Sequence, residues 1–185
     1  MKLVRHLTVT LALISTSLTA IAADTIRDPG QFFFHQSFGD LREELSTARQ
    51  EGQSVLMLMF ENDDCPWCRK VRATMLNHSS VQDHFRKHFR IISIDTEGDT
   101  PVIDFNGKEI AEKDFALKSL RVRATPTFVF YDLEGKQLTK YIGSPRNIDE
   151  LMWLSEFVLD GHYKNTNFDK YKRLKRAESS SDKKS

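Results

Sequence analysis

The sequence has few cysteines, no long apolar run in its main part and almost no net charge. Its 185 residues include two cysteines, Cys65 and Cys68, so it lacks the several spaced pairs that stabilise small disulfide-rich exported proteins. The 27 basic residues nearly balance the 26 acidic ones, and the net charge of +1 neither favours nor excludes a nucleic-acid partner. Stability must therefore come from a hydrophobic core, which a chain of this length with 39% apolar residues can form.

The N-terminus has the features of a signal peptide. Two early basic residues precede a stretch of apolar, Ser and Thr residues at 7–20, and Ala20-Ile21-Ala22 fits the small-x-small cleavage pattern. We therefore expect residues 1–22 to be removed after export, with the cut after Ala22. An uncleaved N-terminal anchor is the alternative. The stretch is short for a bilayer span, and no later segment reaches 18 consecutive apolar residues.

The middle of the chain predicts one α/β domain, residues 38–162. Six consecutive apolar residues at 55–60 are typical of a central strand that is covered on both faces. Asn106-Gly107 predicts the turn of a small hairpin insertion within 96–111. Further strands are expected at 89–95, 127–132 and 136–141, and helices at 40–52, 66–77, 81–88, 112–120 and 148–159, with Asp40, Ser79 or Ser80, and Asn147 at helix starts.

The two ends of the mature chain differ from this domain in composition. Residues 23–37 predict an extended lead-in, in which Phe32, Phe33 and Phe34 pack on one edge of the core. Residues 163–185 form a basic tail, since 169–185 hold seven basic and three acidic residues. We expect the tail to be solvated and mobile. The alternative is a basic patch that contacts an acidic partner or anionic lipid.

The strongest chemical signal is Cys65-Pro66-Trp67-Cys68, between the buried strand and a helix. Pro66 suits the first helical turn, which places Cys65 at or beside the N-cap. Free N–H groups and the helix dipole stabilise a thiolate there, and one turn brings the second sulfur close enough to form a disulfide. The spacing predicts Cys65 as the nucleophile and Cys68 as the resolving thiol.

The residues around this pair have opposing effects. The bases at 69–70 favour a thiolate and the acids at 63–64 disfavour it, so the sequence does not assign a direction to the pKa shift of Cys65. We expect an exposed Cys65, as thiol exchange requires access. An exposed Trp67 would offer a contact surface for partner proteins, whereas partial packing on the helix is the alternative.

A second signal is Thr125-Pro126, directly before an apolar strand. X-Pro bonds tolerate the cis form, and proline donates no backbone hydrogen bond. Next to a strand-CPWC-helix unit we expect a cis bond, which would leave the backbone of Thr125 free to pair with a substrate chain. An ordinary trans proline at a strand start is the alternative.

These residues together resemble the thioredoxin superfamily. The likeness rests on residues 55–60, the CPWC segment and Thr125-Pro126-Thr127, and it covers about 38–159. The chain is most similar to periplasmic SoxW-like thioredoxins, through Phe60-Glu61, the long segment 81–89 before a strand ending at Asp95, and the insertion at 104–107. The resemblance implies a thioredoxin fold, which is a central mixed β-sheet flanked by helices.

The resemblance also implies a periplasmic role that is mainly reducing. Such proteins receive electrons from a membrane dithiol transporter and pass them to an oxidised protein partner, in sulfur-compound oxidation or in cytochrome c maturation. They need no cofactor beyond the redox-active disulfide of Cys65 and Cys68. We expect a monomer that binds no metal and no nucleic acid, with Trp67, Pro66, Thr125 and Pro126 contacting the substrate.

Three departures from thioredoxin leave the direction of electron transfer open between reductant, oxidant and isomerase. Thioredoxin has a buried Asp six residues before its first cysteine, where this chain has Met59. Asp64 replaces the Trp before that cysteine, and the central dipeptide is Pro-Trp instead of Gly-Pro. Glu61 is a candidate replacement proton acceptor, and a solvated loop acid is the alternative for it.

Two other classes of function fit parts of the sequence. Cys65, Cys68, His84 and His88 follow a broad zinc spacing, although core positions of a zinc finger are polar here. We therefore expect both histidines on a solvated helix face. The other class is a non-catalytic binding module with an inert disulfide, which would resist reduction by dithiothreitol.

Overall fold

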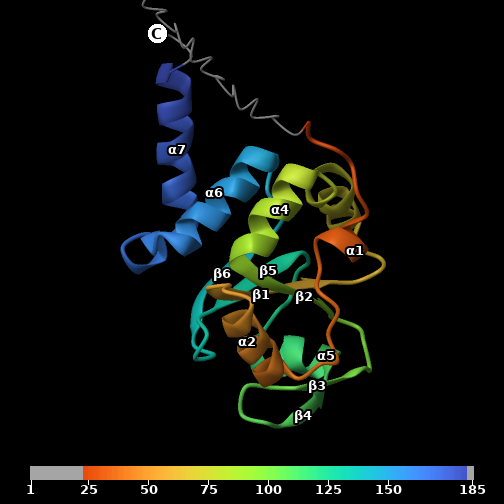
Figure 1. Ribbon diagram of the computed structural model, residues 1–185. Helices are drawn as coiled ribbons and strands as arrows, with labels where there is room; N and C mark the ends of the chain where they lie inside the picture. The colour runs from red at the N-terminus through yellow and green to blue at the C-terminus, as the bar shows by residue number, and fades with distance from the viewer. Residues whose placement is uncertain (1–22, 183–185) are drawn as a thin grey trace, which may run out of the picture.

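The computed structural model describes residues 23–182, which form a mixed four-stranded sheet flanked by helices (Figure 1). The strand order is β2-β1-β5-β6, with β1 parallel to β2 and antiparallel to β5. The strands are β1 (Val55–Glu61), β2 (Phe89–Asp95), β5 (Thr127–Tyr131) and β6 (Gln137–Ile142). The predicted α/β architecture with a central mixed sheet is confirmed.

Two apolar layers cover opposite faces of the sheet. Met57 and Met59 of β1 point into one cluster, and Leu56 and Leu58 point into the other, because successive side chains of a strand alternate between faces. The first layer includes α3 (Pro66–Val71), the π-helical turn η1 (Arg72–Leu76), α4 (Ser79–His88) and α6 (Ile148–Leu159). The second includes α2 (Leu41–Gln50) and the π-helical turn η2 (Phe115–Ser119). All seven residues of β1 are buried, as expected for a central strand.

The predicted N-cap residue is confirmed for two of three helices. The side chain of Asp40 accepts from the N–H of Arg42 at 2.9 Å and begins α2, and Asn147 begins α6 in the same way. For α4 the expected Ser79 or Ser80 is not the cap. The carboxylate of Asp24, from the lead-in, accepts from the N–H of Ser80 at 2.9 Å. A group 56 residues earlier in the chain thus satisfies this free N–H.

The predicted hairpin insertion is confirmed. Strands β3 (Pro101–Ile103) and β4 (Glu109–Ala111) pair antiparallel, and Gly107 adopts φ +82° in the turn. The carboxylate of Asp104 accepts from two backbone N–H groups of this turn, at 2.8 and 2.9 Å. The short helix α5 (Glu112–Asp114) and η2 follow it, close to the expected helix at 112–120.

The lead-in is less extended than expected. It contains the one-turn helix α1 (Pro29–Phe32), and it buries Phe33 and Phe34 while Phe32 stays 42% exposed. The packing prediction is therefore confirmed for two of the three phenylalanines.

The prediction of a mobile tail is wrong for residues 168–182. After the 3-10 turn η3 (His162–Lys164), these residues form helix α7 (Phe168–Asp182). Phe168 and Tyr171 are buried, each with its ring centroid 5.3 Å from that of Phe157 on α6. Composition suggested disorder because basic residues dominate the tail, but its two aromatic side chains supply the apolar face that holds the helix.

Ion pairs also hold α7 against α6. Glu150 on α6 is 2% exposed, and its two carboxylate oxygens contact Lys172 and Arg176 of α7, each at 2.9 Å. A buried carboxylate without a partner is costly, so Glu150 needs α7 in place. The basic residues of the tail are thus partly used inside the molecule.

A buried histidine links the lead-in to the sheet. His35 is 8% exposed, and its Nδ1 accepts from the backbone N–H of Ile91 in β2 at 3.0 Å. Burial lowers the pKa of His35 to about 4, and the charges of Arg86 and Arg90 act in the same direction. The imidazole is therefore neutral near pH 7.

We expect His35 to make the fold sensitive to acid. Between its ordinary pKa of 6.5 and the folded value of about 4, the unfolded chain binds a proton that the folded chain does not. Stability contributed by His35 is therefore full above pH 6.5 and falls by up to ~3 kcal/mol as the pH drops to 4. Urea unfolding across this range should show a shallower pH dependence for His35→Gln. His162→Gln, at a half-buried histidine whose side chain is 41% exposed, is the control, and equal slopes for all three proteins would contradict the role of His35.

Candidate active site

The two cysteines lie at the start of α3, which follows β1 in the chain. A short loop, 62–64, follows β1, and Cys65 is the N-cap residue of α3, with extended backbone angles of φ −79° and ψ 102°. The backbone N–H of Cys68 donates to the Sγ of Cys65 at 3.0 Å, and the two cysteines are joined in a disulfide. Pro66 occupies the first helical turn, as predicted. The arrangement places Cys65 Sγ at the free N–H groups of a helix start.

The disulfide is more buried than the sequence suggested. Cys65 is 5% exposed and Cys68 1% exposed, so the expectation of an exposed Cys65 is wrong for this oxidised form. Both sulfur-bearing side chains belong to the apolar cluster that includes Met59 and Phe128. Cys65 nevertheless remains the outer of the two.

The predicted cis bond between Thr125 and Pro126 is confirmed. Thr127 pairs with Phe60 near the end of β1, so Pro126 lies at the same edge of the sheet as the disulfide. The carbonyl of Pro126 accepts from the N–H of Gly143 at 2.8 Å. Within residues 23–182, the backbone N–H and C=O of Thr125 have no hydrogen-bond partner.

Apolar side chains are exposed around this edge. Trp67 is 56% exposed, as predicted, with the Nζ of Lys70 5.4 Å from its ring centroid. Ile142, which pairs with Thr127 beside Pro126, is 57% exposed. Large apolar groups exposed beside a disulfide are typical of a contact surface.

Glu61 is not the solvated loop acid of the alternative interpretation. It is the last residue of β1 and 8% exposed, and its carboxylate forms a two-point ion pair with Arg72, whose Nε lies 2.8 Å from Oε2. The hydroxyl of Ser93 donates to the same carboxylate. Hydrogen bonding to Glu61 raises the pKa of Arg72, so this guanidinium stays charged.

A cavity of about 470 Å³ connects this ion pair with the resolving cysteine. Its walls include Glu61, Arg72 and Ser93 together with Cys68. The sequence analysis missed Arg72 and Ser93 as members of the site. Arg72 stands four residues after Cys68, which puts both on one helix face, and Ser93 is a polar residue between Ile92 and Ile94 of β2. Those two signals were available in the sequence.

The zinc alternative is wrong in its geometry. His84 and His88 line a cavity with Val55, the first residue of β1, whereas the disulfide follows the far end of that strand, about 20 Å away. Both cysteines are also used in the disulfide. Both histidines are half-buried, whereas the sequence predicted a solvated helix face. The Nε2 of His84 also lies 2.7 Å from the hydroxyl of Ser155.

Comparison with known proteins agrees with this geometry. A family model described as a thioredoxin-like domain matches residues 41–158. The chain belongs to the thioredoxin-like family. This thioredoxin-like protein is 27% identical over 99 residues to the disulfide bond reductase DsbH of Chlamydia pneumoniae, and the match covers 53% of this chain. The match spans 57% of the length of that curated relative.

Solved structures confirm the thioredoxin fold. A thioredoxin-fold protein from Helicobacter pylori superposes with a TM-score of 0.51 at 26% identity, over 68% of this chain and 82% of that one. A DsbH oxidoreductase superposes with a TM-score of 0.53 at 21% identity, over 69% of this chain and 85% of that one, which shows the fold alone. Among the described residues, no helix has the length and apolarity needed to cross a bilayer. The predicted signal peptide, residues 1–22, lies outside the described residues.

Proposed function

We propose that this protein is an exported thiol–disulfide oxidoreductase that reduces disulfides in partner proteins. The observation that carries the proposal is the Cys65–Cys68 disulfide at the start of α3, at the same sheet edge as the cis Pro126. The name of the relative from C. pneumoniae, a disulfide bond reductase, supports the reducing direction. The SoxW-like assignment, the periplasmic location and the monomeric state stay predictions from the sequence.

The reaction starts from the dithiol form. The Cys65 thiolate attacks one sulfur of the substrate disulfide, the substrate S–S bond breaks, and the departing substrate sulfur takes a proton. Cys68, as thiolate, then attacks the Cys65 sulfur of the mixed disulfide and releases the second substrate thiol. Two electrons and two protons pass to the substrate, and Cys65–Cys68 is oxidised. A dithiol donor, which the resemblance places in the membrane, must return the protein to its reduced form.

The start of α3 favours the first step. The N–H of Cys68 points at Cys65 Sγ from 3.0 Å, and α3 continues into η1, so several aligned peptide dipoles face the sulfur. Both effects stabilise the anion more than the neutral thiol. Cys65 is therefore the attacking sulfur, and Cys68, at 1% exposure, reacts only after a substrate is attached.

Substrate docking is assigned to Thr125, Pro126, Pro66 and Trp67. The unpaired backbone groups of Thr125 can accept an extended substrate chain in the manner of an added strand. A groove of about 500 Å³ beside Thr125, with Leu117 and Val122 among its lining residues, offers room for a substrate side chain.

Single-cysteine variants test the assignment of roles. Cys65→Ser should abolish reduction of insulin disulfides, because the attacking sulfur is gone. Cys68→Ser should accumulate mixed disulfides with substrate, which non-reducing gels followed by mass spectrometry detect. His84→Gln, remote from the disulfide, should keep the activity of the parent protein. Unimpaired turnover by Cys65→Ser would refute the assignment of Cys65 as the nucleophile.

The reduction potential of the Cys65–Cys68 pair tests the direction of electron transfer. Equilibration with glutathione or dithiothreitol buffers should give a value below roughly −200 mV, on the thioredoxin side of the known range. A value near about −120 mV would make the protein an oxidant, and an intermediate one near roughly −180 mV would fit an isomerase. A disulfide that dithiothreitol fails to reduce would instead indicate a non-catalytic binding module.

We further propose Glu61 as the group that accepts the proton of Cys68 through the shared cavity. Cys68 has almost no other access to solvent, and the Glu61 carboxylate opens on the same cavity. Arg72 and Ser93 hold that carboxylate in place. A water in the cavity is the natural carrier between the two groups, since polar atoms line it.

Glu61→Gln should slow resolution of the mixed disulfide by about tenfold or more, because general base assistance to Cys68 is lost. Attack by Cys65 should keep its rate. Stopped-flow measurement of both phases separates these steps, with Asp64→Asn as the exposed control. Resolution at the parent rate, in a variant with unchanged thermal stability, would exclude Glu61 as the proton acceptor.

A further inference from the structure

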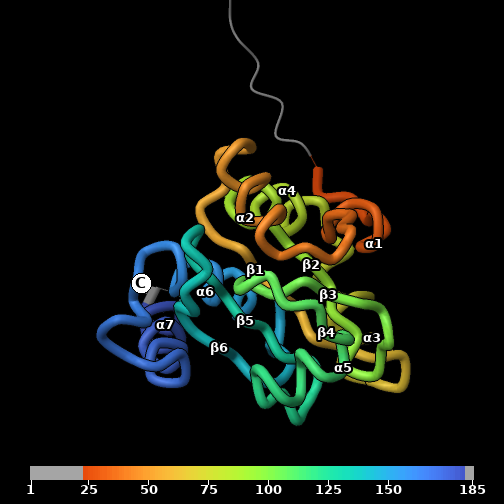
Figure 2. Tube along the Cα trace, turned by 90° about the horizontal axis from the view of Figure 1, so that it is seen from below, coloured from red at the N-terminus to blue at the C-terminus, as the bar shows by residue number. Residues whose placement is uncertain are grey.

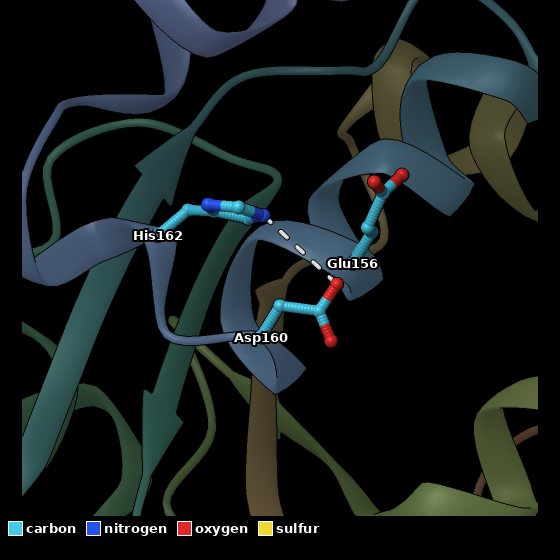
Figure 3. Close-up of side chains that lie close together, drawn as sticks. All are labelled: Glu156, Asp160 and His162. Atoms are coloured by element: carbon cyan, nitrogen blue, oxygen red, sulfur yellow. Dashed lines mark ion pairs between the residues drawn. The ribbon is translucent and has the colours of Figure 1, made fainter.

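A cluster of metal-ligating side chains lies at the end of α6, away from the disulfide. Glu156, Asp160 and His162 bring two carboxylates and an imidazole together, with one ligand atom of each within 4.8 Å of the others. His162 Nε2 faces Asp160 Oδ2 at 3.9 Å, with Glu156 one turn earlier on the helix (Figure 3). The neighbouring helix α7 lies on the opposite side of the molecule from α3 (Figure 2).

The backbone fixes this convergence within seven residues. Glu156 and Asp160 are one helical turn apart, and Asp160 is the C-cap residue of α6. Gly161 then takes a left-handed conformation, φ +71°, which turns the chain so that His162 follows at once. Glycine adopts this conformation without the steric cost that a side chain would add.

The electrostatics of this position favour a cation. The C-terminal end of a helix carries partial negative charge, and α6 adds two carboxylates there while its last turn holds no basic residue. Lys175 of α7 offsets part of this charge, with its Nζ 3.0 Å from Glu156 Oε1. Asp160, whose side chain is 60% exposed, has only the distant His162 ring as an ion-pair partner in the described residues.

A buried hydroxyl beside the cluster points in the same direction. Tyr171 is 7% exposed, and its hydroxyl has no hydrogen-bond partner in residues 23–182. Its ring packs on the His162 ring, with centroids 4.8 Å apart. Donors to a ligating carboxylate typically orient it in metal sites, and Lys175, with its Nζ 3.0 Å from Glu156 Oε1, is placed for that task.

We propose that Glu156, Asp160 and His162 bind a divalent transition-metal ion, with Zn²⁺ as the best fit. One imidazole and two carboxylates suit Zn²⁺, whereas Ca²⁺ and Mg²⁺ prefer ligand sets made only of oxygen. Tetrahedral Zn²⁺ holds its ligand atoms about 3.3 Å apart, so ligand atoms that now lie within 4.8 Å of one another must close by up to roughly 1.5 Å. Their partial exposure allows this movement, and a water fills the fourth position.

Binding at this place would tie the end of α6 to the turn that leads into α7. Tyr171 and Lys175 belong to α7, so a metal that orders Glu156 and His162 also strengthens the α6–α7 contact. The site is structural, and it is independent of thiol exchange.

Calorimetric titration of the tag-free, disulfide-form protein with ZnCl₂ tests the proposal. The disulfide form is used because free thiolates bind zinc themselves. We expect one site, at least tenfold weaker binding in both His162→Gln and Asp160→Asn, and a melting temperature that zinc raises in the parent protein more than in these two variants. Co²⁺ should give weak visible bands without thiolate charge transfer.

The paired variant His84→Gln/His88→Gln is the matched control, since these two histidines line one cavity with Glu156 and Asp160 and their ring centroids lie 5.3 Å apart. It should bind zinc like the parent. Circular dichroism of each variant verifies folding. Absence of binding up to about 1 mM Zn²⁺, or binding lost in the control pair and kept in both site variants, would overturn the proposal.

Discussion

The N–H of Cys68 donates to the sulfur of Cys65, and the proposed chemistry depends on this contact. It exists because β1 ends at the sheet edge and α3 starts five residues later, with Pro66 in the first turn where no N–H is needed. The helix start both draws the two sulfurs together and stabilises negative charge on the outer one. Cys68, which carries the inner sulfur, is 1% exposed in this disulfide form.

The two apolar layers give that helix start a rigid support. β1 is buried along its whole length and paired on both sides, so the position of Cys65 follows from the most enclosed strand of the sheet. The chain ends reinforce the same layer, through Phe33 at one end and Phe168 at the other. Ion pairs of Glu150 hold α7 on α6, in addition to the packing of the aromatic rings.

The buried carboxylate near the disulfide, Glu61, stands at a different position from the buried Asp of thioredoxin. Met59 fills the position beneath the disulfide, in one apolar cluster with both cysteines. Glu61, two residues further along β1, faces the same side of the sheet because strand side chains repeat with a period of two. At the strand end it reaches Arg72 and a polar cavity, so charge is kept beside Cys68 without being buried under the sulfurs.

Neighbouring residues were enough to predict the buried strand, the CPWC helix start, the turn at Asn106-Gly107 and the cis bond before Pro126. Other features emerged only in the folded protein, because their partners lie far apart in the chain. Asp24 caps α4 from the lead-in, Glu61 meets Arg72, and residues 168–182 fold onto α6. Local patterns report propensity and spacing, whereas the pairing of distant groups depends on strand register and helix packing, which no short segment encodes.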